Sequence, residues 1–236
     1  LVTEVIEGRA ENWMTRANKF TPHGHHQMIL PRTCWTTETL HELGGPQRLA
    51  DIIGIACTVS ASELAPERMH LGIHVGYLAG QNFGHQHTHL VDAQYGNGTI
   101  ADADNKVVSY ASDPKHQGRI VTDNGTYRAI AGGERGGMCY IVPVDNPSMS
   151  PTSLADIILK VVSLYSTRFA NTASGKEGLP PEYIIGLKLA NGQVGYGFFV
   201  PILNHFGFPH YFANLGEGAY ILPWPHEKTA EHLLAS

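Results

Sequence analysis

Apolar side chains recur at helical spacing in two long stretches of the chain. The first stretch runs from Pro46 to Leu64 and the second from Pro151 to Asn171. Proline fits the first turn of a helix, because the first N–H groups of a helix have no partner within the helix. Each stretch therefore predicts a long helix with one buried face. The apolar positions are Leu49, Ile52, Ile53 and Ala56 in the first helix, and Leu154, Ile157, Ile158, Val161, Val162, Tyr165 and Phe169 in the second.

Shorter apolar runs between turn residues predict β-strands. Residues 13–31 have the pattern of a hairpin that turns at Pro22-His23-Gly24. Residues 92–128 are rich in Asn, Asp, Gly and Ser, which indicates a connector with hairpins and short strand-like pieces such as Val107–Tyr110. A final helix is expected over 225–234. The other predicted extended segments are 69–77, 85–91, 127–144, 182–189 and 195–203.

The two halves of the chain share one order of predicted elements: hairpin, strand closing in proline, helix, strand, strand. Met28-Ile29-Leu30-Pro31 corresponds to Tyr140-Ile141-Val142-Pro143, and the same shift carries His85, His87 and His89 onto Gly197, Phe199 and Pro201. We expect an α+β fold made of a duplicated unit, in which each half has an antiparallel sheet covered by one long helix. The expected division is 1–92, a connector over 93–126, and 127–236. Chance similarity of two helix-containing hairpin units is the alternative.

Composition narrows the class of protein. The 236 residues are 42% hydrophobic and 16% charged, as in a globular protein, and the net charge of -5 argues against nucleic acid and membrane surfaces as partners. No apolar run is long enough to span a bilayer, and the first residues lack the pattern of a signal peptide. Three cysteines far apart do not form a disulfide framework. We expect a cytoplasmic protein.

Three of the histidines stand at every second position, at His85, His87 and His89. On a strand, side chains alternate between faces, so the three imidazoles would share one face of a sheet. The preceding segment, 76–84, is rich in glycine, which lets a backbone approach a ligand closely. This combination predicts a site for an anion, phosphate above all.

Residues 85–91 resemble the motif of the histidine triad (HIT) superfamily, His-φ-His-φ-His-φ-φ with φ apolar. Gly80-Gln81-Asn82 before the motif and the strand 26–31 add to the resemblance. It implies that His87 attacks the α-phosphorus of a nucleotide and forms a nucleotidyl-imidazole intermediate. It implies further that His85 orients His87 and that His89 contacts the phosphoryl oxygens or the leaving group. The implied substrate-binding positions in this half are Gly80, Gln81, Asn82, His26 and His74.

The duplicated layout is similar to the two-lobed branch of that superfamily, the galactose-1-phosphate uridylyltransferases and dinucleoside polyphosphate phosphorylases. Tyr211–Glu217 is similar to the segment by which the uridylyltransferases contact the sugar phosphate, which implies substrate contacts from Asn214 and Glu217. The resemblance implies a HIT-like fold in each half, with the triad kept in the first half and degenerate in the second. The implied partner is a nucleotide or nucleotide sugar, and a homodimer is compatible with it.

Several departures leave the reaction open. Transferases of that branch have Gln as the last residue of the triad, whereas this chain has His89, the residue usual in hydrolases. In addition, Gln86 and Thr88 are polar at positions where the family motif has apolar residues. A nucleotidyltransferase or phosphorylase and a nucleotide hydrolase therefore both remain. The Cys-x-x-Cys zinc pair of many uridylyltransferases is absent, so we expect that no metal or other cofactor is required.

Two readings from other classes also remain. A strand with His-x-His is a known way to hold zinc or another divalent cation, here with His85 and with Cys34, His70 or His74 as further ligands. A protein that binds a nucleotide or sugar phosphate without catalysis is the other. The three tryptophans fit packing better than base stacking, and His23, His25 and His41 are expected to be solvated.

Overall fold

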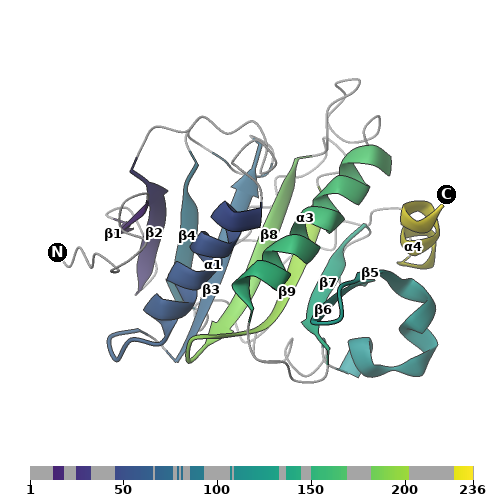
Figure 1. Cartoon of the computed structure of the whole chain (residues 1–236), viewed down its shortest axis with the longest axis horizontal. Helices are drawn as coiled ribbons and strands as arrows, with labels where there is room; N and C mark the ends of the chain where they lie inside the picture. The colour runs from purple at the N-terminus through teal and green to yellow at the C-terminus, as the bar shows by residue number, and fades with distance from the viewer. Residues whose placement is uncertain are drawn as a thin grey trace.

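The described strands form one antiparallel sheet of nine strands in a computed structural model of the chain (Figure 1). The order across the sheet is β1-β2-β4-β3-β8-β9-β7-β6-β5. The strands are β1 (Trp13–Ala17), β2 (His26–Pro31), β3 (Arg68–Val75), β4 (Thr88–Asp92), β5 (Ile120–Asp123), β6 (Tyr127–Ala131), β7 (Cys139–Pro143), β8 (Tyr183–Ala190) and β9 (Gln193–Pro201). The residues that the structure describes are 13–18, 25–32, 46–65, 67–76, 79, 81, 86–92, 107, 109–132, 137–144, 150–168, 182–201 and 226–235.

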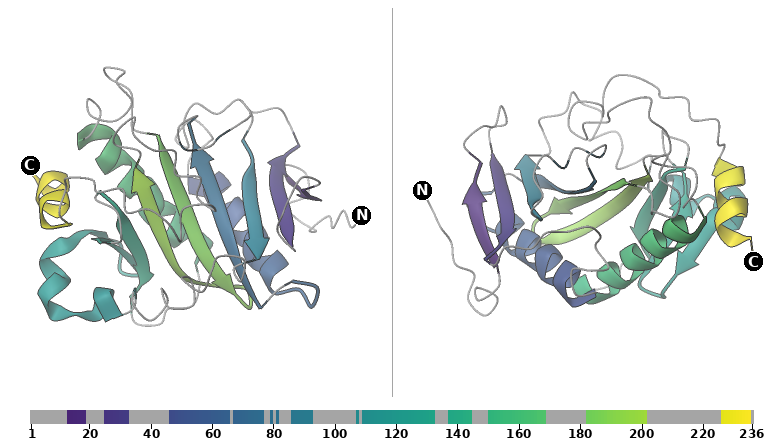
Figure 2. Two further views of the ribbon diagram at one scale, coloured as in Figure 1. Left: turned by 180° about the vertical axis from the view of Figure 1, so that it is seen from behind. Right: turned by 90° about the horizontal axis from the view of Figure 1, so that it is seen from above.

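Two long helices, α1 (Pro46–Ser60) and α3 (Pro151–Arg168), pack against each other and lie on the same face of the sheet (Figure 2). A third helix, α4 (His226–Leu234), packs at the edge formed by β5 and β6. Within the described residues, no helix is both long and apolar enough to cross a membrane. The protein is therefore a mixed structure of helices and one antiparallel sheet, as the sequence predicts.

The helix-facing side of the sheet carries the larger core. Odd-numbered residues of β3 and β8, such as Leu71, Ile73, Ile185 and Leu187, point toward α1 and α3 and are fully buried. The even-numbered residues of the same strands point to the opposite face, as the two-residue period of a strand requires. A smaller apolar cluster lies on that opposite face toward β9, β7 and β6.

Local sequence explains where several elements begin and turn. Ser150 caps α3, because its Oγ accepts a hydrogen bond from the N–H of Ser153 at 3.2 Å and Pro151 follows it. The β8–β9 hairpin turns at Asn191 and Gly192, which adopt positive φ angles of 50° and 76°. An Asn-Gly pair with positive φ at both positions is typical of the tightest hairpin turns.

Most predicted elements are confirmed, with differences at their ends. The predicted helix 46–64 ends at Ser60, and the helix predicted over 151–171 is described as far as Arg168. The predicted strand at Val107–Tyr110 is wrong, because Val107 and residues 109–112 are helical. The two halves were expected to have a sheet each, whereas their strands join in one sheet through the pairing of β3 with β8.

Candidate functional site

Four histidines meet on the face of the sheet opposite α1 and α3. We refer to His26, His74, His87 and His89 as the histidine cluster. His89 lies at its centre: the centroid of its ring is 4.9 Å from that of His87, 5.2 Å from that of His26 and 5.5 Å from that of His74. The cluster joins residues from three neighbouring strands, β2, β4 and β3, together with the residue that precedes β4.

Strand register explains why these rings meet. His89 pairs with Met28 on β2 and with Gly72 on β3. His26 and His74 each lie two residues from one of those partners, so they share the face of His89 as diagonal neighbours. Gly72 has no side chain, which leaves room beside the ring of His89. The prediction that His87 and His89 share a face agrees with this geometry, although the strand itself begins only at Thr88.

A chain of polar contacts leads from the β1–β2 hairpin to His89. His26 Nε2 lies 3.0 Å from His89 Nδ1, and the amide nitrogen of Asn18 lies 3.4 Å from His26 Nδ1. The same Asn18 nitrogen lies 3.5 Å from His26 Nε2, so the tautomer of His26 decides which of its ring nitrogens accepts from Asn18. In the tautomer with a proton on His26 Nε2, that N–H donates to His89 Nδ1, and His89 then carries its own proton on Nε2, from which it can donate a hydrogen bond.

Burial differs among the four rings. His87 is 8% exposed and His74 is 6% exposed, whereas His89 is half-buried. A buried imidazole that acts as a nucleophile or hydrogen-bond donor is only partly surrounded by water. Its electrostatic interactions with a bound anion are therefore stronger than they would be in bulk solvent.

His70 lies on the same face of β3 but outside the cluster. It faces Val91 on one side and Lys188 on the other, and it is 3% exposed. Burial, and secondly the charge of Lys188, lowers the pKa of His70 to about 3. His70 is therefore a neutral residue of the sheet at physiological pH.

Gln81, expected near a phosphate, is hydrogen-bonded to Gly76 at the end of β3. Its side-chain Oε1 accepts a hydrogen bond from the N–H of Gly76 at 2.9 Å, and its own N–H donates to the carbonyl oxygen of Gly76 at 3.1 Å. Gly76 has a φ of +97°, which a glycine adopts without strain. These two hydrogen bonds fix the position of Gly76, the residue that directly follows β3, the strand that carries His74.

Other predicted site residues lie outside the described part of the chain. This group consists of Gly80, Asn82, His85, Asn214, Glu217 and Cys34. Within the described residues, no group of three or more His, Cys, Asp or Glu side chains has the arrangement of a metal site.

Asn18 is a member of the candidate site that no motif in the sequence predicts. It directly follows β1, and its N–H donates to the carbonyl oxygen of His26 at 3.0 Å, which closes the β1–β2 pairing. The register of the predicted hairpin would have placed it beside His26. His25, expected to be solvated, is half-buried and lies within hydrogen-bonding distance of Gln27, with its Nε2 3.3 Å from the Gln27 amide nitrogen.

Comparison with known proteins gives matches of structure only. No family model matches the chain, and no curated protein matches its sequence. A uridylyltransferase structure is similar over 94% of this chain and 83% of its own, with 14% identity and a TM-score of 0.63. A GalT-like protein from Arabidopsis thaliana is 13% identical, with coverages of 94% and 82% and a TM-score of 0.66. An ADP-glucose phosphorylase from the same plant, with bound ADP-glucose, is 12% identical, with coverages of 95% and 82% and a TM-score of 0.66.

Proposed function

We propose that this chain, whose fold is that of the galactose-1-phosphate uridylyltransferase-like branch of the histidine triad superfamily, is an enzyme that transfers a nucleotidyl group through His87. The observation that carries the proposal is the histidine cluster. It places the ring of His87 beside that of His89, and His89 in turn is oriented by His26. The proposed substrate is a nucleotide or a nucleotide sugar, the class to which the ADP-glucose bound by one structural neighbour belongs.

In the proposed reaction, an unprotonated ring nitrogen of His87 attacks the α-phosphorus. A P–N bond forms while the bond from phosphorus to the leaving phosphate oxygen breaks. An acceptor then attacks the same phosphorus, the P–N bond breaks, and the imidazole is regenerated. Phosphoryl chemistry of this kind depends on positioning and on donors around the oxygens, which side chains of this protein are proposed to supply.

His89 supplies the donor in this proposal. Its Nε2–H would donate to a phosphoryl oxygen or to the leaving oxygen as negative charge develops there. His26 and Asn18 are proposed as positioning residues, because a proton on His26 Nε2 would hold His89 in the tautomer that can donate. His85 is proposed to orient His87. The substrate positions proposed from the family resemblance are His74, Gly80, Gln81, Asn82, Asn214 and Glu217.

A hydrolase is the second candidate, and the third histidine favours it. An imidazole N–H can protonate the leaving group and then accept a proton from water, whereas a glutamine side chain can do neither. The acceptor would then be water in place of phosphate or a sugar phosphate. The ratio of hydrolysis to phosphorolysis of one substrate distinguishes the two candidates.

We also propose that the chain is a duplicated unit with halves at 1–92 and 127–236 and a connector at 93–126. Support comes from the order of elements, β1-β2-α1-β3-β4 followed by β6-β7-α3-β8-β9, and from the sheet order, in which β3 and β8 adjoin at the centre.

The test replaces the proposed nucleophile. His87→Ala should reduce turnover of ADP-glucose or of a dinucleoside polyphosphate by about 10⁴-fold or more, because the covalent intermediate cannot form. With substrate labelled at the α-phosphate, wild-type protein should accumulate acid-labile, base-stable label and His87→Ala none. His89→Gln should keep the label but lower hydrolysis more than phosphorolysis.

His25→Ala is the matched control, since His25 lies near the cluster but is not part of it. It should keep most of the activity. Full activity of His87→Ala on every substrate that the wild-type protein turns over would rule out the covalent mechanism. Circular dichroism of each variant checks that the fold is intact.

A further inference from the structure

A cavity of about 310 Å³ lies on the same face of the sheet as the histidine cluster, but toward the opposite edge. Gly195 on β9 is the lining residue nearest to β4 in strand order, three strand steps away, so the cavity lies about 14 Å or more from His89 across the sheet. It is therefore a separate site, and the proposed reaction does not use it. The residues that line it are Ala111, Ser112, Gln117, Arg128, Val142, Pro143, Val144 and Gly195.

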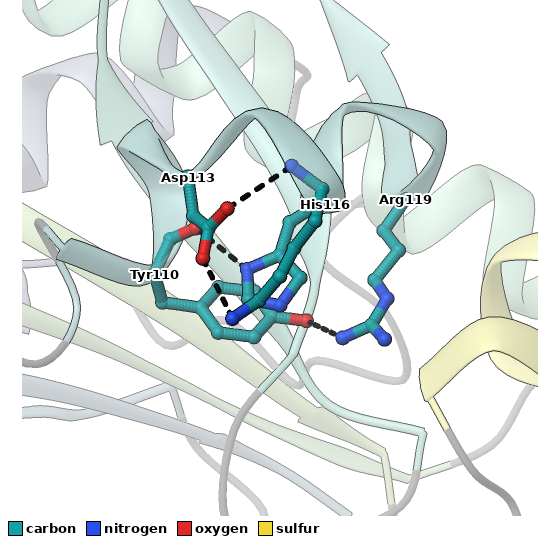
Figure 3. Close-up of polar contacts among 5 residues, drawn as sticks. Tyr110, Asp113, His116 and Arg119 are labelled. Atoms are coloured by element: carbon teal, nitrogen blue, oxygen red, sulfur yellow. Dashed lines mark hydrogen bonds and ion pairs between the residues drawn. The ribbon is translucent and has the colours of Figure 1, made fainter.

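One wall of the cavity is fixed by a cluster of contacts around Tyr110 (Figure 3). The Tyr110 hydroxyl donates to the carbonyl oxygen of Ala131 at 2.7 Å and accepts from Arg119 at 2.8 Å. The ring of His116 stacks on that of Tyr110 with centroids 3.9 Å apart. These contacts attach residues 109–112 and the 3₁₀ helix η2 (Pro114–Arg119) to β6. Ala111, Ser112 and Gln117 belong to this attached segment, so the wall is preformed.

The opposite rim is opened by a bulge in β9. Lys188 pairs with Tyr196 and Leu189 with Val194, which leaves Gly195 as an extra residue without a partner on β8. A Cβ atom at Gly195 would have only the carbonyl oxygen of Lys188 within 4 Å, at 3.9 Å. The rim at this position is therefore open space.

Among the described residues that line the cavity, Arg128 is the one that carries a charge. Its Nε lies 3.2 Å from a carboxylate oxygen of Asp123 in an ion pair, yet this buried N–H makes no hydrogen bond. The four N–H groups on the terminal nitrogens remain for another acceptor. A buried donor without a hydrogen bond is costly unless a ligand or water satisfies it.

We propose that this cavity binds a small molecule that joins a carboxylate to a compact apolar body. The planar fork of Arg128 matches a carboxylate, and Val142, Pro143 and Val144 supply an apolar surface for the rest of the ligand. Ser112 and Gln117 are exposed and can hydrogen-bond a polar substituent. A single arginine that already faces Asp123 suits a monoanion better than a phosphate dianion, since no lysine is among the described lining residues.

Benzoate is the probe, with benzamide as its neutral isostere and phenyl phosphate as the dianion. Benzoate should bind with a Kd on the order of 1 mM by calorimetry and ligand-observed NMR. Benzamide and phenyl phosphate should bind at least about 10-fold more weakly. Arg128→Gln should weaken benzoate binding by about 10-fold or more, whereas Arg16→Gln, which removes the same charge on β1, should leave it unchanged.

Gly195→Leu tests the site without touching the arginine. Its side chain has room on the backbone and narrows the cavity, so it should also weaken benzoate binding. His87→Ala should bind benzoate as the wild-type protein does, which separates this site from the histidine cluster. The proposal is overturned if benzoate shows no saturable binding up to about 10 mM, if neither Arg128→Gln nor Gly195→Leu weakens it, or if phenyl phosphate binds more tightly.

Discussion

At the scale of single residues, His70 controls how the centre of the sheet responds to acid. Burial between Val91 and Lys188 lowers its pKa to about 3, from an ordinary value of 6.5. Between these pH values the unfolded chain binds a proton that the folded protein does not. The free energy of unfolding should therefore fall as the pH drops from 6.5 to 3, by up to about 1.4 kcal/mol per pH unit from this group.

His70→Gln removes this titration while keeping a polar side chain of similar size. Urea unfolding at a series of pH values should show a shallower loss of stability in acid for the variant than for the wild-type protein. Above pH 7 the two slopes should coincide, because His70 is neutral in both the folded and the unfolded state. Equal slopes below pH 6 would mean that His70 is protonated in the folded protein.

The sequence predicts which histidines lie together at the candidate site better than it predicts the contacts that orient them. A period of two is enough to place His87 and His89 on one face, and the family resemblance points to His26 and His74. Asn18 contacts His26 only because of the register of the β1–β2 hairpin. Gly72 lies beside His89 only because β3 pairs with β4. Neither is visible in the local pattern of residues.

At the scale of elements, the β8–β9 turn is pressed against the end of α1. Ser60 Oγ accepts from the N–H of Gly192 at 3.1 Å and donates to the carbonyl oxygen of Cys57 at 3.0 Å. A Cβ atom at Gly192 would lie 3.0 Å from the Cβ of Ala61. This long-range contact explains why α1 stops at Ser60, although its apolar pattern continues toward Leu64.

Gly192→Ala and Gly125→Ala form a matched pair that measures this contact. Both glycines have left-handed backbone, with φ of +76° and +79°, but a Cβ at Gly125 would have no atom within 4 Å. Gly125→Ala should cost about 1 kcal/mol from backbone strain alone. Gly192→Ala should cost about 1 kcal/mol more, because Ala61 must move. Urea denaturation measures the loss in free energy of unfolding for both variants. Equal losses would show that Ala61, at the end of α1, moves aside without an energetic cost.

The connector shows where local pattern misleads. Two adjacent valines favour a strand at Val107–Tyr110, because β-branched residues fit a pleated surface. The chain is helical there because Tyr110 reaches Ala131 on β6 and stacks on His116. Tertiary contacts thus override β-strand propensity in this short segment, which also forms part of one wall of the cavity.

At the scale of the whole molecule, the pairing of β3 with β8 joins the two halves. The pairing runs along the whole of β3, from Arg68 opposite Ala190 to Val75 opposite Tyr183. Helices α1 and α3 pack together over the same seam. The similar order of elements in each half is visible in the sequence. Their union in one sheet is not, since it depends on residues far apart in the chain.

We expect the described core to unfold as one cooperative unit. Leu187 on β8 is fully buried opposite Leu71 on β3, and truncating it to alanine should cost about 2–5 kcal/mol through lost contacts and a cavity. If the sheet is one unit, Leu187→Ala should raise the hydrogen-exchange rates of the slowest amides in β4, in the other half, by the same factor as those in β9. Leu234→Ala, at a position 51% exposed, is the control and should leave both strands unchanged. Faster exchange confined to β8, β9 and β7 would instead show two units that open independently, and the histidine cluster would then owe its stability to the first half alone.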